Sequence, residues 1–244
     1  MGIEVIVDAR EALADLVLRR FEAAARTAIA ARGRFACALP GGSVAEAFLP
    51  RLAGASVDWS RVDVFWGDER AVPPTDPDAN YGLTRRLLLD RIPIDPARVH
   101  RIHGEEPDLE AAAAAYAREL AGTIGARPLD LVLLGMGPEG HVCSLFPGHP
   151  ALRESARAVV AVHDSPKPPP RRITLTLVPL TGAELVCVAA FGAEKANAVR
   201  EAVEVADSRL PVALAARAGA HALFLLDRDA ASGLRGRPVV GPSA

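Results

Sequence analysis

Lysine is scarce in this chain: only two of its 28 basic residues, Lys167 and Lys195, are lysines, and the rest are arginines. Arginine therefore serves wherever any surface cation will do. A lysine kept against such a bias offers a compact ammonium charge that the planar guanidinium does not replace. We expect a particular role for Lys195, which other features also single out. For Lys167, a functional role and chance occurrence are both open.

Long apolar runs and cysteines are also few. No stretch approaches the ~20 consecutive apolar residues of a membrane-spanning helix, and the N-terminal segment lacks the basic start of a signal peptide. Three cysteines are an odd number and suggest no disulfide framework. A net charge of −2 gives no reason to expect a nucleic-acid or membrane-surface partner. These absences predict a globular protein of the cytoplasm.

Several motifs of metal and cofactor binding are missing. The chain contains no HExxH, CxxC, G-x-S-x-G or Walker A sequence, and its six histidines lack the spacing of metal ligands. The string GMGPEG fits G-x-G-x-x-G, but no helix with an acidic residue about 20 positions further on follows it. We therefore expect no metal and no cofactor.

The chain instead alternates short apolar runs with longer helical ones, which predicts an α/β fold with a doubly wound, mostly parallel sheet flanked by helices. At 244 residues, half of them hydrophobic, the chain is long enough for one large domain or two small ones. We expect strands at Ile3–Asp8, Phe35–Pro40, Val62–Gly67, Leu129–Met136, Ala158–His163, Ile173–Leu177, Leu185–Phe191 and Ala222–Leu226, and helices at Arg10–Ala31, Tyr81–Ile92, Leu109–Ile124, Glu194–Glu204, Pro211–Ala218 and directly after Ser43.

Three of the expected strands end in polar or glycine-rich turns. These turns read PGGS (Pro40–Ser43), GDER (Gly67–Arg70) and GMGPEGH (Gly135–His141). Ligands of open parallel sheets bind beyond the carboxyl ends of the strands. The three turns are therefore expected to meet at one crevice.

The first two turns suit an anion. Gly41 and Gly42 let the backbone approach a ligand closely, and Ser43 is expected to cap the helix that follows, whose N-terminal N–H groups attract negative charge. In the second turn, Arg70 can bind phosphate, and a carboxylate beside it, such as Asp68, would hold the guanidinium. The alternatives are an ordinary tight turn and a surface ion pair.

The third turn offers a general base. His141 follows a buried strand and is flanked by glycines, and its neutral imidazole can accept a proton near neutral pH. Glu139 could orient the ring. Cys143 raises the alternative of a Cys–His nucleophilic pair.

Two further cations point toward an anion. Lys195 begins a helix, where a positive charge is unfavourable for the helix dipole unless an anion shares the site. Arg172 opens a strand and adds positive charge.

Taken together, these blocks resemble the 6-phosphogluconolactonase family, which shares its fold with glucosamine-6-phosphate deaminase and ribose-5-phosphate isomerase. The chain departs from the family pattern at Val44, Glu139, Val142 and Cys143, where the family has threonine, aspartate, threonine and alanine. The resemblance is carried by PGGS (40–43), WGDERAVPPTDPDANYG (66–82), GMGPEGHVCSLFPGHPAL (135–152), PKPPPRRITLT (166–176), FGAEKANAV (191–199) and LPVALAARAGAHALFLLDRDAA (210–231).

The resemblance implies a single domain over residues 1–244 that hydrolyses 6-phospho-D-glucono-1,5-lactone, with this small phosphorylated sugar lactone as its ligand. The sequence itself does not determine the oligomeric state, and we expect a monomer. His141 would be the base and Glu139 its partner, and backbone N–H groups near Gly137–Gly140 are candidates for stabilising the oxyanion. The alternatives are a sugar-phosphate isomerase or deaminase with Glu139 or Asp68 as base, and a phosphosugar-binding regulator. The phosphate-binding set would be Gly41, Gly42, Ser43, Arg70, Arg172 and Lys195, with Asp68 beside them.

Overall fold

The computed structural model describes residues 3–236 and 239–240, which form two sheets and six α-helices. The larger sheet consists of β1 (Ile3–Val7), β2 (Phe35–Leu39), β3 (Val62–Trp66), β5 (Leu131–Gly135), β8 (Leu185–Ala190), β9 (Ala222–Leu226) and β10 (Val239–Val240). The α-helices are α1 (Arg10–Arg32), α2 (Gly42–Leu52), α3 (Asn80–Leu87), α4 (Leu109–Ile124), α5 (Ala196–Glu204) and α6 (Pro211–Ala218). Short 3-10 helices lie at Trp59–Arg61, Leu89–Arg91, Pro96–Arg98, Pro150–Arg153 and Ala193–Lys195.

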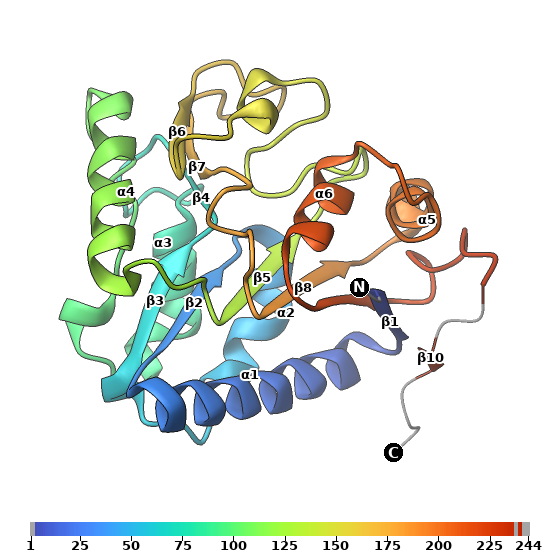
Figure 1. Cartoon of the computed structure of the whole chain (residues 1–244), viewed down its shortest axis with the longest axis horizontal. Coiled ribbons are helices and arrows are strands. Elements are labelled where there is room, and N and C mark those ends of the chain that lie inside the picture. Colours follow the sequence, from blue (N-terminus) through green and yellow to red (C-terminus); the bar gives the residue numbers. More distant parts are fainter. Residues whose placement is uncertain (1–2, 237–238, 241–244) are drawn as a thin grey trace.

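The seven strands of the larger sheet are all parallel, in the order β10-β1-β9-β8-β5-β2-β3 (Figure 1). From β2 the chain continues outward to β3, whereas from β5 it continues in the opposite direction to β8 and β9. The order therefore reverses between β2 and β5. Such a switch point leaves a crevice beyond the carboxyl ends of the two strands.

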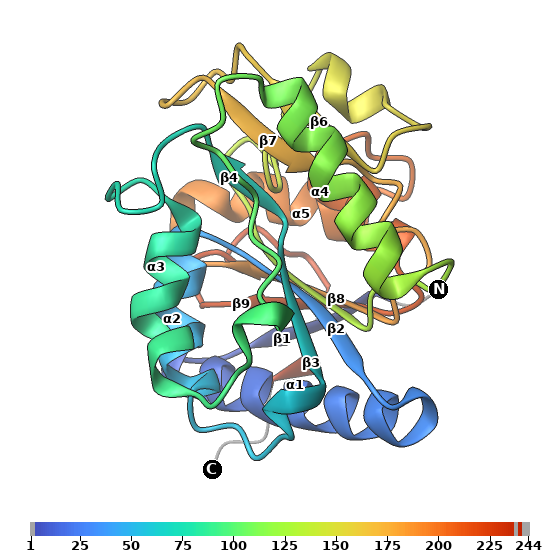
Figure 2. The same cartoon turned by 90° about the vertical axis from the view of Figure 1, so that its left-hand side faces the viewer.

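The strands of this sheet are apolar because helices cover both faces. Every residue of β2, β3 and β9 is buried, as expected for a parallel sheet without a solvent face. Helices α2 and α3 lie on one side of the sheet and α4 on the other (Figure 2). The predicted α/β fold with a mostly parallel sheet is confirmed.

A second, three-stranded antiparallel sheet lies beyond the carboxyl end of β3 (Figure 1). It consists of β4 (Asp68–Arg70), β7 (Arg172–Leu175) and β6 (Val159–Val162). Gly67 joins the two sheets: its N–H donates to Leu39 O at 3.1 Å, and its carbonyl accepts from Leu175 N at 2.8 Å. The GDER segment is thus not a loose turn after a strand, because it supplies an edge of this second sheet.

Within residues 3–236 and 239–240, the structure contains no helix that is both long enough and apolar enough to span a membrane.

A buried histidine outside the switch point links stability to pH. The ring of His100 stacks on Phe65, with 4.4 Å between ring centroids, and its nitrogens lie 2.8 Å from Glu119 Oε1 and 3.2 Å from Asp63 Oδ1. Burial alone would lower the pKa of His100, but the two carboxylates outweigh it and raise the pKa. The protonated ring is therefore favoured by the folded state.

The pKa of His100 is higher in the folded than in the unfolded chain. Its contribution to the free energy of unfolding is therefore fully present at acidic pH, and it is lost as the pH rises through the pKa of the folded state. We expect His100→Gln to lower the free energy of unfolding by roughly 1–3 kcal/mol below pH 6. The difference should shrink as the pH rises above neutral. Urea unfolding of both proteins across this range measures it, and a pH-independent difference would contradict the assignment.

Candidate active site

The three predicted turns meet at one cavity of about 170 Å³ beyond the carboxyl ends of β2 and β5. The expected convergence of these turns at one crevice is thus confirmed. Eight of the nine predicted site residues line the cavity, and the ninth, Glu139, contacts one of the eight. The eight are Gly41, Gly42, Ser43, Asp68, Arg70, His141, Arg172 and Lys195.

In the loop after β5, the His141 ring lies directly against the backbone of Gly137. A Cβ atom at Gly137 would lie 2.0 Å from His141 Nδ1, so only glycine allows this approach. Nδ1 lies 2.8 Å from Glu139 Oε1. A carboxylate only accepts, so Nδ1 carries the proton and Nε2 keeps a free lone pair. Burial lowers the pKa of His141, although the nearby Glu139 charge raises it, and the ring is neutral at neutral pH.

The loop after β2 brings a helix N-terminus to the cavity. Helix α2 begins at Gly42 with Gly41 as its N-cap, and no side chain caps it. The predicted capping by Ser43 is therefore wrong, because the helix starts two residues earlier than expected and Ser43 lies within its first turn. Gly41 is needed here, since a Cβ atom would lie 1.8 Å from Asn80 Oδ1. The first N–H groups of α2 have no partner within the helix.

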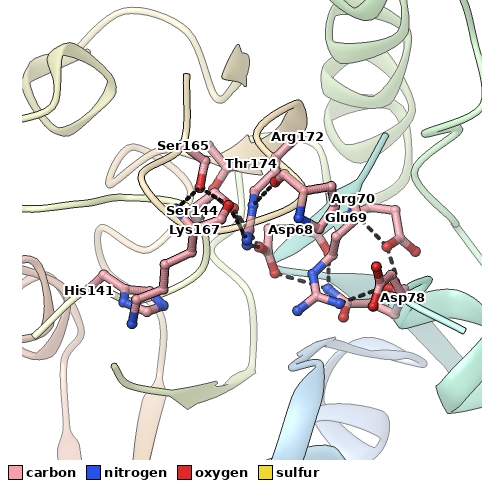
Figure 3. A network of polar contacts seen from close by, with 12 residues as sticks. Asp68, Glu69, Arg70, Asp78, His141, Ser144, Ser165, Lys167, Arg172 and Thr174 are labelled. Carbon is pink, nitrogen blue, oxygen red and sulfur yellow. Dashed lines mark hydrogen bonds and ion pairs between the residues drawn. The ribbon is translucent and has the colours of Figure 1, made fainter. Parts of the chain in front are cut away.

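Asp68 is the centre of a buried polar network (Figure 3). Ser144 Oγ donates to its Oδ2 at 2.7 Å, and Asn80 Nδ2 donates to its Oδ1 at 3.1 Å. Its nearest cation is Arg172, with Nη1 3.8 Å from Oδ2. The expectation that Asp68 holds the Arg70 guanidinium is therefore wrong.

Arg70 is held by backbone instead. Its Nη1 donates to the carbonyl of Asp78, and its own N–H donates to Glu69 Oε1 at 2.7 Å. The buried Nε has no hydrogen-bond partner within the described residues. The guanidinium thus lines the cavity with unused hydrogen-bonding capacity.

Arg172 is largely occupied by the proline-rich loop that precedes it. Its Nε donates to Pro169 O at 3.0 Å, and its Nη2 donates to Lys167 O at 3.1 Å and to Pro168 O at 3.0 Å. Its side chain is only 5% exposed, and burial lowers its pKa. Arg172 brings positive charge to the cavity while most of its N–H groups hold the loop.

Lys195 is the N-cap residue of α5 and is buried. Its backbone N–H donates to Gly192 O at 3.2 Å, but within the described part of the chain its ammonium group makes no hydrogen bond or ion pair. Burial lowers its pKa, opposed by the charges of Glu194 and Asp227. An unpaired buried ammonium that lines a cavity is a cation prepared for an anionic ligand.

One predicted alternative within the third turn fails, and one set of candidate donors is narrowed. Burial raises the pKa of the Cys143 thiol well above its usual range, so Cys143 supplies no thiolate for a Cys–His pair. The N–H groups of Gly137 and Gly140 donate to His141 O and Gly137 O, each at 2.9 Å. These two N–H groups are therefore not free to bind an oxyanion, and the N–H of Glu139 is the remaining candidate in this stretch, since Pro138 has none.

Sequence reasoning missed Asn80 as a cavity residue and gave Ser144 and Lys167 no place in the site. Ser144 and Asn80 bind Asp68, and Lys167 Nζ lies 2.9 Å from Glu139 Oε2. The rarity of lysine was the one signal that pointed to Lys167. Among the residues described, no group of three or more His, Cys, Asp or Glu side chains could hold a metal ion.

Comparison with known proteins agrees with this geometry. Residues 8–224 match the family described as "Glucosamine-6-phosphate isomerases/6-phosphogluconolactonase". A 6-phosphogluconolactonase of Streptomyces coelicolor is 43% identical over 92% of this chain and 92% of its own. One from Mycobacterium tuberculosis is 43% identical over 96% and 98%. The crystal structure of 6-phosphogluconolactonase from Thermotoga maritima superposes with a TM-score of 0.81 at 26% identity, covering 93% of this chain and 99% of that one.

Proposed function

Since this chain belongs to the glucosamine-6-phosphate isomerase/6-phosphogluconolactonase family, we propose that it hydrolyses 6-phospho-D-glucono-1,5-lactone to 6-phospho-D-gluconate, a reaction of the oxidative pentose phosphate pathway. The observation that carries the proposal is the joint placement of a neutral imidazole and unpaired cationic groups around one cavity. That arrangement fits a neutral ester at one end of a ligand and a phosphate at the other.

His141 acts as the general base. Its Nε2 takes a proton from a water molecule as the water oxygen bonds to the lactone carbonyl carbon. When the bond between that carbon and the ring oxygen breaks, the imidazolium returns the proton to the departing oxygen. Glu139 holds Nδ1–H at 2.8 Å and stabilises the imidazolium that forms in between. The proposed steps use neither metal nor cofactor.

The phosphate binds at the cationic side of the cavity. Arg70 and Lys195 have unused donors, and the N-terminal N–H groups of α2, at Gly42 and Ser43, are suited to an anion. Arg172 contributes mainly charge, since the proline-rich loop occupies most of its donors. Asp68 organises this side through Asn80 and Ser144.

We further propose that the protein acts as a monomer in the cytoplasm. The residues assigned to the reaction and the cavity belong to one chain, so the proposed reaction needs no residue from a second copy.

Lactone opening releases acid, so the reaction is followed by proton release in weakly buffered solution against the spontaneous rate. We expect rapid hydrolysis of freshly prepared 6-phosphogluconolactone and no ammonia from glucosamine 6-phosphate. Ammonia release would instead identify a deaminase, with a carboxylate as base. Tight binding of the phosphosugar without turnover of either compound would identify a regulator.

A further inference from the structure

Lys167 is one of only two lysines in the chain, and it contacts the side chain that holds the base. We propose that Lys167 is a positioning residue, which holds the Glu139 carboxylate so that the His141 ring stays neutral and correctly oriented. The inference rests on the proposed function, since it concerns the base of that reaction.

The three side chains form a continuous polar chain. Lys167 Nζ lies 2.9 Å from Glu139 Oε2, and Glu139 Oε1 lies 2.8 Å from His141 Nδ1. Each carboxylate oxygen thus has its own partner. Lys167 and His141 lie together at one end of the network in Figure 3, and Arg70 and Asp78 lie at the other. The two contacts fix the plane of the carboxylate, and with it the ring.

The backbone of Lys167 is itself held. Its carbonyl accepts from Ser165 Oγ at 2.9 Å and from Arg172 Nη2 at 3.1 Å, and Arg172 also binds the next two carbonyls of the loop. Arg172 is buried and lines the cavity. A lysine on a free loop would lose most of its conformational entropy by pairing, whereas this one starts from an anchored backbone.

The charges that face His141 explain why the carboxylate needs a second partner. Burial lowers the pKa of His141, the carboxylates of Glu139 and Asp68 raise it, and the Lys167 ammonium lowers it. Lys167 therefore offsets the effect of Glu139 on the proton affinity of the ring. The ring also contacts Phe146, with 4.5 Å between centroids, and this side chain adds no charge. With Lys167, the ring keeps an orienting acceptor and stays free to take a proton.

The competing reading is an ordinary surface ion pair, because the Lys167 and Glu139 side chains are 41% and 36% exposed. Such a pair contributes little to stability. It also leaves the titration of His141 and the pH dependence of turnover unchanged. The two readings therefore differ in measurable quantities.

Lys167→Met keeps the length of the side chain and removes its charge, and Lys167→Arg keeps the charge. We expect Lys167→Met to raise the pH midpoint of the acidic limb of kcat/KM and to lower kcat near neutral pH by roughly two- to fivefold, the range of a partly exposed ion pair. Lys167→Arg should restore both. Arg171→Met is the matched control, since Arg171 is exposed in the same loop but reaches Pro107 O at 3.4 Å.

Imidazole NMR of the full chain tests the proposal without substrate, with the His141 signal assigned from its absence in His141→Asn. A higher His141 pKa in Lys167→Met than in the parent and in Arg171→Met supports the proposal whether or not the lactone is the substrate. An unchanged His141 titration and pH profile in folded Lys167→Met would overturn it, as would a rise in KM alone. Absence of lactone turnover by the parent protein would refute the proposed function and leave the NMR result standing.

Discussion

Replacing His141 by alanine is expected to lower kcat for lactone hydrolysis by about 10²–10⁴-fold, the usual contribution of a positioned base. KM should change little, because the proposed phosphate-binding groups are other cationic and backbone groups that line the cavity. The hydrolysis that remains in His141→Ala comes from the spontaneous reactivity of the ester and from the positioning of the bound substrate. A stopped-flow assay of proton release, corrected for the spontaneous rate, gives both constants.

Glu139→Gln is the matched comparison for this experiment. An amide can still accept a hydrogen bond from Nδ1–H, but it carries no charge to stabilise the imidazolium. We expect a kcat between those of the parent and His141→Ala. Full turnover by a folded His141→Ala protein would refute the assignment of the base, and loss through KM alone would make His141 a binding residue.

Replacing Lys195 by methionine is expected to raise KM by roughly 10- to 100-fold, the equivalent of one charge-assisted hydrogen bond. The ammonium lines the cavity and is buried. Since the variant leaves the other proposed phosphate-binding cations and the proposed base unchanged, kcat should fall less than KM rises. Steady-state kinetics with the lactone separate the two constants.

The same substitution, which is expected to weaken substrate binding, is not expected to lower stability. A buried ammonium without a partner is costly to the folded state, so Lys195→Met should unfold at the same temperature as the parent protein or at a higher one. Lys195→Arg serves as the control, because it keeps the charge in a side chain of different shape. A lower Tm for Lys195→Met together with an unchanged KM would show that Lys195 supports the fold and does not bind phosphate.

The elements with strong local signals were predicted well from the sequence. Helix α4 has the predicted bounds, Leu109–Ile124, because Asp108 accepts hydrogen bonds from two N–H groups of its first turn and Gly125 follows its last residue. The helix predicted at Tyr81–Ile92 instead ends at Leu87. There the buried Leu88 leaves helical geometry, with φ −132° and ψ −62°. The helix ends where Leu88 is buried in the core, and the leucines at this point of the sequence do not indicate a helix end.

The antiparallel sheet could not be derived from the sequence. Strands β6 and β7 were predicted, but the pattern of apolar residues in a strand does not indicate which sheet the strand joins. β4 is three residues long and entirely polar, so it has no apolar pattern to detect. The prediction of one domain over residues 1–244 stays a prediction.

Which residues line the cavity was predictable, but how they pair was not. The turns after parallel strands converge by topology, and this brought Asp68, Arg70 and His141 together. The partner of Asp68 depends on the register between β4 and β7, which sets Arg70 opposite Arg172. Since alternate residues of a strand share a face, Asp68 and Arg70 point the same way, and a strand a hundred residues later supplies the cation. No local pattern records that register.

The junction at Gly67 has a consequence for ligand length. The imidazole is carried by the parallel sheet, whereas Arg70 and Arg172 belong to the antiparallel one, and backbone hydrogen bonds on either side of Gly67 fasten the two together. The distance between the backbone segments that carry the imidazole and the guanidinium groups is thus set by main-chain geometry. Under the proposed function, a lactone whose ester and phosphate groups lie closer together would therefore fit this cavity less well.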